Sequence, residues 1–544
     1  MSGQLTVLQQ ESTLSVVDVE FAQTVCSLAG ESRDALLLAC AMACHAAFDG
    51  HVCLDLTALC RSGLYTAEGR PSDVALPPFD EWCRVLRSSP VCSDGTGVTP
   101  LVLDGSGRLY LERNFRAQQR LAAMIKERVT ATKAALPDDP AERAVVLSRE
   151  ARFLVITGGP GTGKSTLVAR LIKNLPADAL SRVRLVAPTG KAAVRLQEAM
   201  GHGAMPVSTI HRALGIRPER PASPLFCADN PLPAEVLIVD EASMVDLHLM
   251  VRLFEAVPSR CRMILVGDRD QLASVEAGAV LRDICGDDDG SLVNPSLAAS
   301  IVSLTRNWRF PAHSAIGRLA ASINRGDGDD VIALLAAGGD EVGWICPDSD
   351  EPASPLLSPV LEEGFSPLLG ADSSDAQLDA IDRFRVLCAV RRGPWGVERV
   401  GALAAEMAAR KGRSDLSPVM VVKNDYGAEL FNGDTGVRRR DGNGDRVVLR
   451  DAKGKVRDIA SSALPPHEPA WAVTVHKAQG SEFDHVVIVL PSTPSPVLSR
   501  ELLYTAVTRA RRRVTIVGKR DIIAHCVAAP TARASGLRDL LWNK

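Results

Sequence analysis

A glycine-rich run at residues 158–166 has the residue types needed to surround a phosphate group. It follows the apolar stretch 153–157 (FLVIT) and precedes a helical pattern. A loop between a strand and a helix points its backbone N–H groups at a bound anion. Lys164 can reach β- and γ-phosphates, and the Ser165 hydroxyl suits Mg²⁺. The sequence therefore predicts a nucleoside-triphosphate site formed by Gly158, Gly159, Pro160, Gly161, Thr162, Gly163, Lys164, Ser165 and Thr166.

Two adjacent carboxylates, Asp240 and Glu241, follow the apolar run 236–239. Asp240 is suited to order the Mg²⁺ shell through water, and Glu241 to polarise the attacking water. One carboxylate for the metal and one for the water is typical of a hydrolase, whereas a kinase binds an acceptor hydroxyl and excludes water. Taken alone, the pair is also compatible with a helix N-cap followed by first-turn charge.

A third apolar run, 262–268 (RMILVGD), ends in Asp268, and Gln271 follows it. We expect the Gln271 amide, at the tip of a strand beside the nucleotide, to sense the γ-phosphate. Loop and helix residues 273–284 would then carry that signal away from the site. Lys164, Asp240, Glu241 and Gln271 are the predicted catalytic residues of this half of the chain.

Short apolar strands that alternate with helices must position these residues. Such a pattern predicts an α/β fold with parallel sheets covered on both faces. The predicted strands of a first region are residues 153–157, 182–188, 236–242 and 262–268. Those of a second region are residues 384–390, 418–422, 485–490 and 513–518.

Three other stretches differ in character. Residues 1–130 predict a mainly helical unit with a strand pair at Pro100–Leu111, and Leu136–Pro140 reads as a linker. The acidic, Pro/Ser-rich stretch 347–375 is interpreted as a loop or mobile insertion. Residues 432–469, with short strands and Gly/Asp turns, predict a small β-barrel inserted into the second sheet domain.

Composition excludes several classes of protein. The 544 residues are 46% hydrophobic and 23% charged, which rules out global disorder. The formal charge of −3 does not suggest nucleic acid, but a local basic stripe is enough to bind it. No apolar stretch is long enough to span a membrane and no secretory signal is recognised, so we expect a cytoplasmic protein. Cys40, Cys44 and His45 are possible metal ligands, although helical spacing favours core packing of the two thiols.

Ten motifs follow one another in a fixed order along the chain. They are GGPGTGKST, APTGKAA, STIHRALG, VDEASMVDL, VGDRDQLASVEAGAVLRDI, LTRNWRF, VLCAVRRGPWGVERV, LFNGDTG, VTVHKAQGSEFD and LLYTAVTRARRRV. With these motifs the chain resembles superfamily 1 helicases and, most closely, the RecD family, the 5′→3′ motors of RecBCD-type complexes. The resemblance covers Leu154–Gly518, about two thirds of the chain.

The resemblance implies an ATP and Mg²⁺ site shared by two RecA-like motor domains. Arg309 and Arg509 would be arginine fingers that reach across the cleft and neutralise the transferring phosphoryl group. Glu482 would contact the ribose, and Trp308 would stack beside the adenine, although Trp308 is also compatible with a core position. Related helicases carry a glutamine upstream of the phosphate loop, and Glu142 lies near that place here.

The resemblance also implies contacts with the backbone of a single DNA strand. These side chains are short hydroxyl, amide and cationic donors, which bind phosphates without reading sequence. Some of them are equally explained as helix caps. The first motor domain would contribute Thr189, Lys191, Thr209 and His211, and the second Asn424, Thr474, His476 and Lys477.

The implied architecture divides the chain into an N-terminal helical domain that docks on a partner, two motor domains and an SH3-like barrel. The implied partners are DNA, as a 5′-ended single strand and at duplex ends, and RecB-like and RecC-like subunits. Two alternatives stay open: a helicase that works alone, and an ATP-gated DNA-binding subunit that does not translocate. The expected ranges are 1–135, 136–300 with a small insertion near 216–233, 301–435, 436–469 for the barrel, and 470–544.

Overall fold

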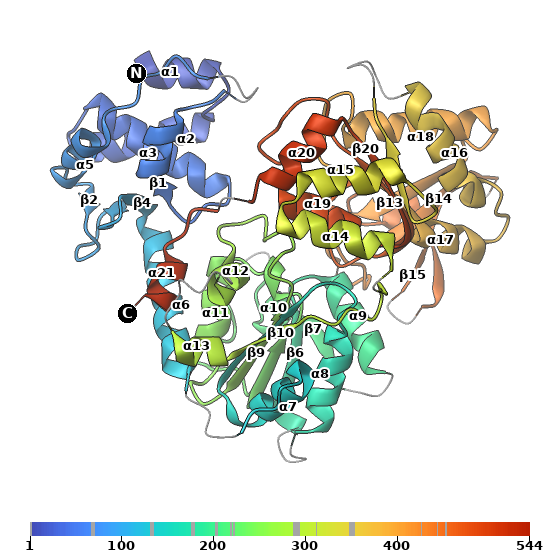
Figure 1. The fold of residues 1–544 in the computed structure, drawn as a ribbon, viewed down its shortest axis with the longest axis horizontal. Helices are drawn as coiled ribbons and strands as arrows, with labels where there is room; N and C mark the ends of the chain where they lie inside the picture. The colour runs from blue at the N-terminus through green and yellow to red at the C-terminus, as the bar shows by residue number, and fades with distance from the viewer. Residues whose placement is uncertain are drawn as a thin grey trace.

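Two parallel sheets and one antiparallel sheet carry the residues of interest in the computed structural model, with a helical unit at the N-terminus (Figure 1). The structure describes residues 3–66, 71–130, 135–175, 180–201, 205–217, 220, 223–286, 294–311, 313–347, 354–425, 427–442, 444–451, 454–531 and 533–543. None of the helices within these ranges is long and apolar enough to cross a membrane.

The N-terminal unit packs helices around a four-stranded sheet of order β1-β4-β3-β2. The predicted strand pair is confirmed, because β3 and β4 are antiparallel and the Asp104 N–H donates to the Arg108 carbonyl at 3.0 Å. Cys40 and Cys44 are buried in α3, as core packing predicts. The elements are α1 (Gly3–Gln10), α2 (Val16–Leu28), α3 (Asp34–Phe48), β1 (Leu54–Asp55), α4 (Leu56–Ser62), α5 (Phe79–Arg87), β2 (Cys92–Ser93), β3 (Leu101–Leu103), β4 (Arg108–Leu111) and α6 (Glu112–Arg128).

The first sheet domain is built on a parallel sheet of order β10-β5-β9-β8-β6-β7. Alternate residues of β5 enter two different cores, Phe153 and Val155 on one face and Leu154 and Ile156 on the other. β10 pairs with β5, so this sheet extends past the expected boundary at residue 300. Its elements are α7 (Pro140–Glu150), β5 (Phe153–Gly158), α8 (Lys164–Lys173), β6 (Val183–Ala187), α9 (Gly190–Met200), β7 (Val207–Thr209), α10 (Ile210–Ala213), β8 (Val236–Val239), α11 (Leu247–Glu255), β9 (Arg262–Gly267), α12 (Val280–Cys285), α13 (Pro295–Ala299) and β10 (Ile301–Leu304).

The second sheet domain has a parallel sheet of order β11-β20-β19-β12-β18. The central strand β12 and most of β19 are buried on both faces, which accounts for the continuous apolar runs in the sequence. Its elements are α14 (Ala315–Arg325), α15 (Gly328–Ala337), β11 (Val342–Ile345), α16 (Ser354–Leu369), α17 (Ser374–Arg383), β12 (Phe384–Cys388), α18 (Val397–Arg410), β18 (Ala472–Thr474), β19 (Phe483–Val489), α19 (Arg500–Val507), β20 (Ala510–Val517) and α20 (Arg520–Ala528).

The interpretation of residues 347–375 as a loop is wrong for most of that stretch. Residues 354–369 form α16, although Pro359 and Pro367 lie inside it. The apolar side chains recur with helical spacing and are buried against the second sheet; they are Leu357, Val360, Leu361, Phe365 and Leu368. Residues 348–353 lie outside the described residues. In the sequence, the prolines and acidic residues hid the helical spacing of the apolar side chains. That spacing becomes clear once the buried side chains are known.

The expected place of residues 418–422 in the second parallel sheet is also wrong. Residues 418–421 belong to β13 (Leu416–Val421), which pairs antiparallel with β14 and β17 in the sheet β16-β15-β14-β13-β17. A short apolar run indicates a buried strand but not the sheet that holds it. The other strands of this antiparallel unit are β14 (Thr435–Asp441), β15 (Gly444–Arg450), β16 (Val456–Ala460) and β17 (His467–Pro469).

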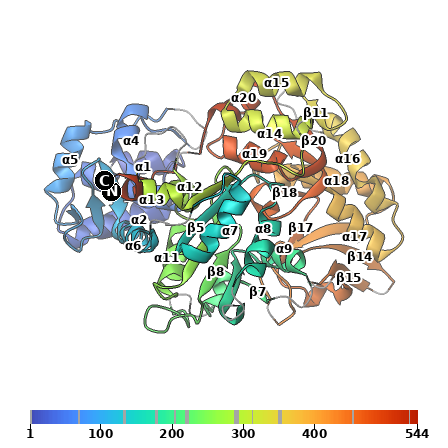
Figure 2. The ribbon, with the colours of Figure 1, turned by 60° about the horizontal axis from the view of Figure 1, so that its bottom comes forward.

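The C-terminal segment leaves the second sheet domain and returns to the other two bodies. Its helix α21 (Leu537–Trp542) packs against α6, away from the other red elements, in both views (Figures 1 and 2). The Arg533 guanidinium donates to the Gly50 carbonyl at 2.7 Å, and the Trp542 indole donates to the Asp283 carbonyl at 3.2 Å. One chain segment thus ties the second sheet domain to the first and to the N-terminal unit.

Candidate functional site

The glycine-rich loop joins the end of β5 to the start of α8, as the sequence predicts. Gly161 and Gly163 have φ angles of +79° and +85°, in the region where side chains are strained. A Cβ at Gly161 would also lie 2.4 Å from the Cβ of Arg309. These glycines therefore permit the turn and the close approach of the second sheet domain.

The Lys164 ammonium is held inside this loop. Its Nζ donates to the carbonyls of Gly158 at 2.6 Å and Gly159 at 2.9 Å, while the Thr162 hydroxyl donates to the Gly159 carbonyl at 2.8 Å. Carbonyl dipoles only partly neutralise an ammonium. Together with the N-terminus of α8, Lys164 therefore offers positive charge to a phosphate.

The carboxylates Asp240 and Glu241 follow directly after β8. Burial and the neighbouring Glu241 raise the pKa of Asp240 to about 7, although Lys164 and Arg195 act in the opposite direction. Glu241 has φ of +50°, an uncommon conformation for a residue with a side chain. The influence of Lys164 on Asp240 indicates that the acidic pair and the phosphate loop share one site. Ser165 and Asp240 supply hydroxyl and carboxylate oxygens, the donor types that Mg²⁺ prefers.

Gln271 faces Asp268 rather than open space. Its amide donates to Asp268 Oδ2 at 3.0 Å, and the Tyr504 hydroxyl of α19 donates to the same oxygen at 3.2 Å. A Cβ at Gly159 would lie 2.8 Å from Tyr504 Oη, so this hydroxyl lies against the phosphate loop. Sequence reasoning missed Tyr504, although it stands in the same motif as Arg509.

The two predicted arginine fingers lie close to the loop and the acids. Arg309 Nη2 contacts Glu482 Oε1 at 2.7 Å, while its Nη1 is buried without a hydrogen-bond partner. Arg509 is 3% exposed, and its guanidinium donates to the carbonyls of Thr505 and Ser481. Burial lowers the pKa of Arg509, although the nearby carboxylates Glu241 and Glu482 act to raise it. The unpartnered Nη1 of Arg309 can therefore donate hydrogen bonds to an anion at the cleft.

Trp308 lies at the edge of the same loop and is 66% exposed, which excludes the core position. Its backbone N–H donates to the Gly161 carbonyl at 2.8 Å. The Arg306 guanidinium carbon lies 3.7 Å from the ring centroid, a cation–π contact. An exposed ring beside the phosphate loop is available to stack on a base.

A cavity of about 370 Å³ opens beside the loop, between the two sheet domains. It has both apolar and polar walls, and its size falls within the range of small-molecule sites. The first sheet domain contributes Gly159, Pro160 and Thr162, and the second contributes Phe310, Arg318, Asn324 and Tyr504. It is a candidate volume for part of the nucleotide.

Glu482 contacts arginines in this structure instead of facing a free volume. Besides Arg309, its carboxylate contacts Arg511 at 3.3 Å and Arg195 of the first sheet domain at 3.6 Å. Burial opposes ionisation, but the surrounding arginines lower the pKa of Glu482 to about 2. Arg195 was missed in the sequence, where its spacing of four residues from Lys191 was the available signal.

The first predicted set of DNA-binding residues lies at the starts of α9 and α10. The Thr189 and Thr209 hydroxyls each cap a helix, accepting the N–H groups of Ala192 and Arg212 at 3.2 Å. A capping hydroxyl can still donate its proton to a phosphate. Burial and Arg385 lower the pKa of Lys191 to about 8, and His211 is exposed.

The second set lies on the antiparallel unit and around β18. The Asn424 amide oxygen accepts the Asn432 N–H at 2.8 Å, and Lys477 Nζ contacts Glu468 at 2.5 Å. Thr474 accepts the Lys477 N–H at 3.4 Å. Burial lowers the pKa of His476, so this imidazole favours its neutral form.

A second cavity, of about 570 Å³, lies between the first sheet domain and the antiparallel unit. Its walls combine apolar, cationic, acidic and hydroxyl side chains with two glycines. The first sheet domain contributes residues from α9 to just after α10, including Gly190, Val207, Thr209, Arg212 and Arg217, and the antiparallel side contributes Glu429, Phe431 and Asp451. The predicted strand-binding residue Thr209 thus lines an open volume shared by two bodies.

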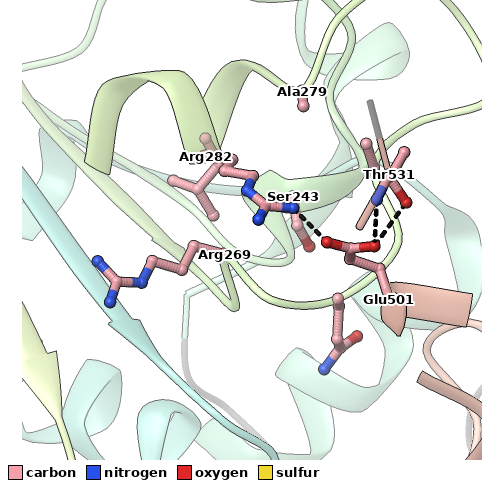
Figure 3. Close-up of a pocket in the computed structure, with 9 residues that line it drawn as sticks. Ser243, Arg269, Ala279, Arg282, Glu501 and Thr531 are labelled. Carbon is pink, nitrogen blue, oxygen red and sulfur yellow. Dashed lines mark hydrogen bonds and ion pairs between the residues drawn. The ribbon is translucent and has the colours of Figure 1, made fainter. Parts of the chain in front are cut away.

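Away from the cleft, a buried contact joins the sheet domains beyond Gln271. The Leu272 N–H donates to the Thr505 hydroxyl at 2.9 Å, and the Gln479 amide donates to the Leu272 carbonyl at 3.1 Å. Beside it, Arg282 and Thr531 point at Glu501 around a cavity with room for about one water (Figure 3).

Comparisons with known proteins agree with this arrangement. Three family models match: an AAA domain over residues 141–277, the RecD N-terminal domain of RecBCD enzymes over 10–110, and a UvrD-like helicase C-terminal domain over 469–517. The RecBCD enzyme subunit RecD of Mycobacterium tuberculosis H37Rv is 39% identical over 99% of this chain and 96% of its own.

Two further relatives extend the comparison. The RecBCD enzyme subunit RecD of Mycolicibacterium smegmatis is 36% identical over 97% of both chains. The ATP-dependent RecD2 DNA helicase of Deinococcus radiodurans is 34% identical over 76% of this chain and 56% of its own. With a phosphate loop, an acidic pair and opposed arginines in place, the chain belongs to the RecD family of ATP-dependent DNA helicases.

Proposed function

We propose that this chain is a 5′→3′ single-stranded DNA translocase and helicase subunit. It works in the cytoplasm with RecB-like and RecC-like partners on duplex ends during double-strand break repair. The observation that carries the proposal is the cleft itself, where the phosphate loop that holds Lys164 lies against Arg309, and Glu241 lies near Arg509. Hydrolysis in such a site depends on how the two domains approach each other.

In the proposed reaction, Lys164 and the N-terminus of α8 bind the ATP phosphates. Glu241 takes the proton of the attacking water, and Arg309 and Arg509 neutralise the charge that develops on the transferring phosphoryl group. Mg²⁺, held by Ser165 and Asp240, would supply further charge neutralisation between the phosphates. Gln271 is assigned a sensing role through Asp268 and Tyr504, because its amide already contacts Asp268.

Movement follows from two strand-binding sets on two bodies. Thr189, Lys191, Thr209 and His211 hold the strand on the first sheet domain. Asn424, Thr474, His476 and Lys477 hold it on the second. When ATP closes the cleft, the distance between the two sets changes, and the set that binds the strand more tightly alternates. Net motion requires only that the affinity of each set for the strand depends on the nucleotide state.

The remaining bodies fit accessory roles in a complex. We assign the antiparallel unit as the SH3-like domain, and residues 216–233, of which 218, 219, 221 and 222 lie outside the described residues, as the duplex-splitting wedge. The N-terminal unit docks the RecC-like partner. Exposed apolar side chains on its helices, such as Leu28 at 86% and Phe48 at 65%, support this docking role.

A second candidate is a helicase that works alone. The 34% identity to the RecD2 helicase over three quarters of this chain favours it, whereas the RecD N-terminal match favours a subunit. An ATP-gated subunit without translocation is disfavoured, because Lys164, Asp240, Glu241, Gln271, Arg309 and Arg509 are all present.

The test is unwinding of a labelled duplex with either a 5′ or a 3′ single-stranded tail, in the presence of ATP and Mg²⁺. Unwinding from the 5′ tail alone supports the proposed polarity and a motor that functions by itself. Strand-stimulated ATP hydrolysis without unwinding supports a motor that requires its partners. Unwinding from the 3′ tail alone contradicts the polarity.

A further inference from the structure

Three guanidinium groups from two domains converge on the carboxylate of Glu482. Arg309 contacts Oε1 at 2.7 Å, while Arg511 and Arg195 contact Oε2 at 3.3 and 3.6 Å. Arg309, Arg511 and Glu482 belong to the second sheet domain. Arg195 alone comes from the first, so its contact with Glu482 crosses the cleft.

Arg195 stands on α9 one turn after Lys191. Residues four apart lie on the same side of a helix, separated by about 6 Å along its axis. The first turn of α9 holds Thr189 and Lys191, which are assigned to strand binding, while Arg195 faces the ATP cleft. One short rigid helix therefore has a strand-binding end and a cleft-facing side chain.

Glu482 is the ion-pair partner of Arg195 across the cleft. Glu482 is ionised throughout the neutral range, so its contacts with the arginines persist at physiological pH. Arg195 and Arg309 thus share one carboxylate, so a displacement of Arg195 would change the charge balance beside Arg309.

We propose that Arg195 is a positioning residue that couples strand binding to ATP hydrolysis: α9 transmits the contact with the strand to Arg195, which holds Glu482 and thereby orients Arg309. The inference rests on the proposed strand-binding role of α9 and on the proposed role of Arg309. Arg195 itself is not required to touch ATP or the strand. Its substitution should therefore reduce stimulation by single strands more than ATP binding.

The experiment is steady-state ATP hydrolysis by the full chain with and without saturating oligo-dT. Arg195→Ala is expected to lower the strand-stimulated kcat by about tenfold, with less than about a twofold change in KM for ATP. Arg195→Lys restores part of the stimulation, because a point charge keeps the ion pair but not the planar fork. Arg182→Ala is the matched control, since Arg182 forms an exposed ion pair with Glu235 in the same domain.

A double variant tests the route through Glu482. If Arg195 acts through Glu482, Arg195→Ala combined with Glu482→Gln is no slower than Glu482→Gln alone. Losses that multiply would overturn the proposal. So would wild-type stimulation in Arg195→Ala, or a stimulation defect that disappears at higher oligo-dT concentration, because the residue would then be only a strand contact.

Arg309→Ala separates this inference from the proposed function. Normal ATP hydrolysis by Arg309→Ala would contradict the role of Arg309 as an arginine finger, and with it the proposed hydrolysis site. Loss of hydrolysis in Arg309→Ala together with normal stimulation in Arg195→Ala would overturn the coupling role alone. Circular dichroism of Arg195→Ala and Arg195→Lys verifies that both variants are folded.

Discussion

The two sheet domains share a parallel architecture but bring different groups to the cleft. The first carries a glycine-rich loop with Lys164 and two carboxylates at the ends of its strands. The second carries no such loop after β12 and instead contributes Arg309 and Arg509. In the proposed mechanism, the first domain binds phosphate and activates water, while the second stabilises the charge that hydrolysis creates. Neither is sufficient alone, which makes hydrolysis sensitive to their approach.

The contacts between the domains differ in the same way. At the cleft they include the Arg195–Glu482 ion pair at 3.6 Å and leave Arg309 Nη1 without a partner. Beyond Gln271 they are buried backbone and side-chain hydrogen bonds around Leu272, with the Arg282–Glu501 ion pair beside them. An ionic contact can exchange its partner for a phosphate, whereas a satisfied buried hydrogen bond resists opening. The cleft is therefore the side expected to move, and the Leu272 contact the side that stays.

The largest effect should come from Lys164→Ala, which removes the phosphate-binding charge of the first domain. We expect ATP hydrolysis to fall by about 10³-fold or more, to the background of the assay. Lys173→Ala, an exposed lysine at the other end of α8, is the matched control and should retain wild-type turnover. Near-normal hydrolysis by Lys164→Ala would place the phosphate site elsewhere.

Arg309→Ala removes the opposed charge of the second domain. By analogy with arginine fingers in general, kcat should fall by about 10³-fold while ATP binding changes only severalfold. Fluorescent nucleotide binding and turnover, measured on the same preparation, separate the two quantities. Arg325→Ala, which breaks an exposed ion pair with Asp330 at the end of α14, is the control. A loss of ATP binding equal to the loss of kcat would mean that Arg309 binds the nucleotide rather than only stabilising the charge that hydrolysis creates.

Glu241→Gln sharpens the assignment within the first domain. The amide keeps the shape of the side chain but cannot accept the proton of the attacking water, so kcat should fall by about 100-fold or more with ATP binding preserved. Pre-steady-state hydrolysis and nucleotide affinity are the measurements. Parallel losses of binding and turnover would show that Glu241 holds the nucleotide instead of activating water.

The strands that end at the proposed catalytic residues were predictable, because apolar runs followed by glycine or acid mark the carboxyl ends of buried parallel strands. The phosphate loop and the acidic pair lie at β5 and β8, as expected. The helix α16 and the antiparallel placement of β13 were not predictable, because a proline-rich stretch and a short apolar run do not show which elements they pack against.

Cross-domain contacts were equally hidden in the sequence. Tyr504 reaches Asp268 across 236 positions, and Arg195 reaches Glu482 between two domains. The sequence separation between each of these residues and its partner gives no sign that the two are in contact. The resemblance indicated the types of residue at the cleft, but only the fold brings together the hydroxyl, carboxylate and guanidinium groups that join its two sides.

The smallest expected effect comes from breaking the buried hydrogen bond between the Leu272 N–H and the Thr505 hydroxyl, which we expect to stay formed. Thr505→Val preserves shape but leaves the buried Leu272 N–H without an acceptor, at a cost of about 1–3 kcal/mol. Thr508→Val is the matched control, because the Thr508 hydroxyl donates only to the Thr505 carbonyl of its own helix. Urea unfolding of both variants measures the difference. If the Leu272 contact fixes the domains to each other, Thr505→Val should be the less stable variant. Equal stability would mean that the ionic cleft and the C-terminal segment already hold the two domains together.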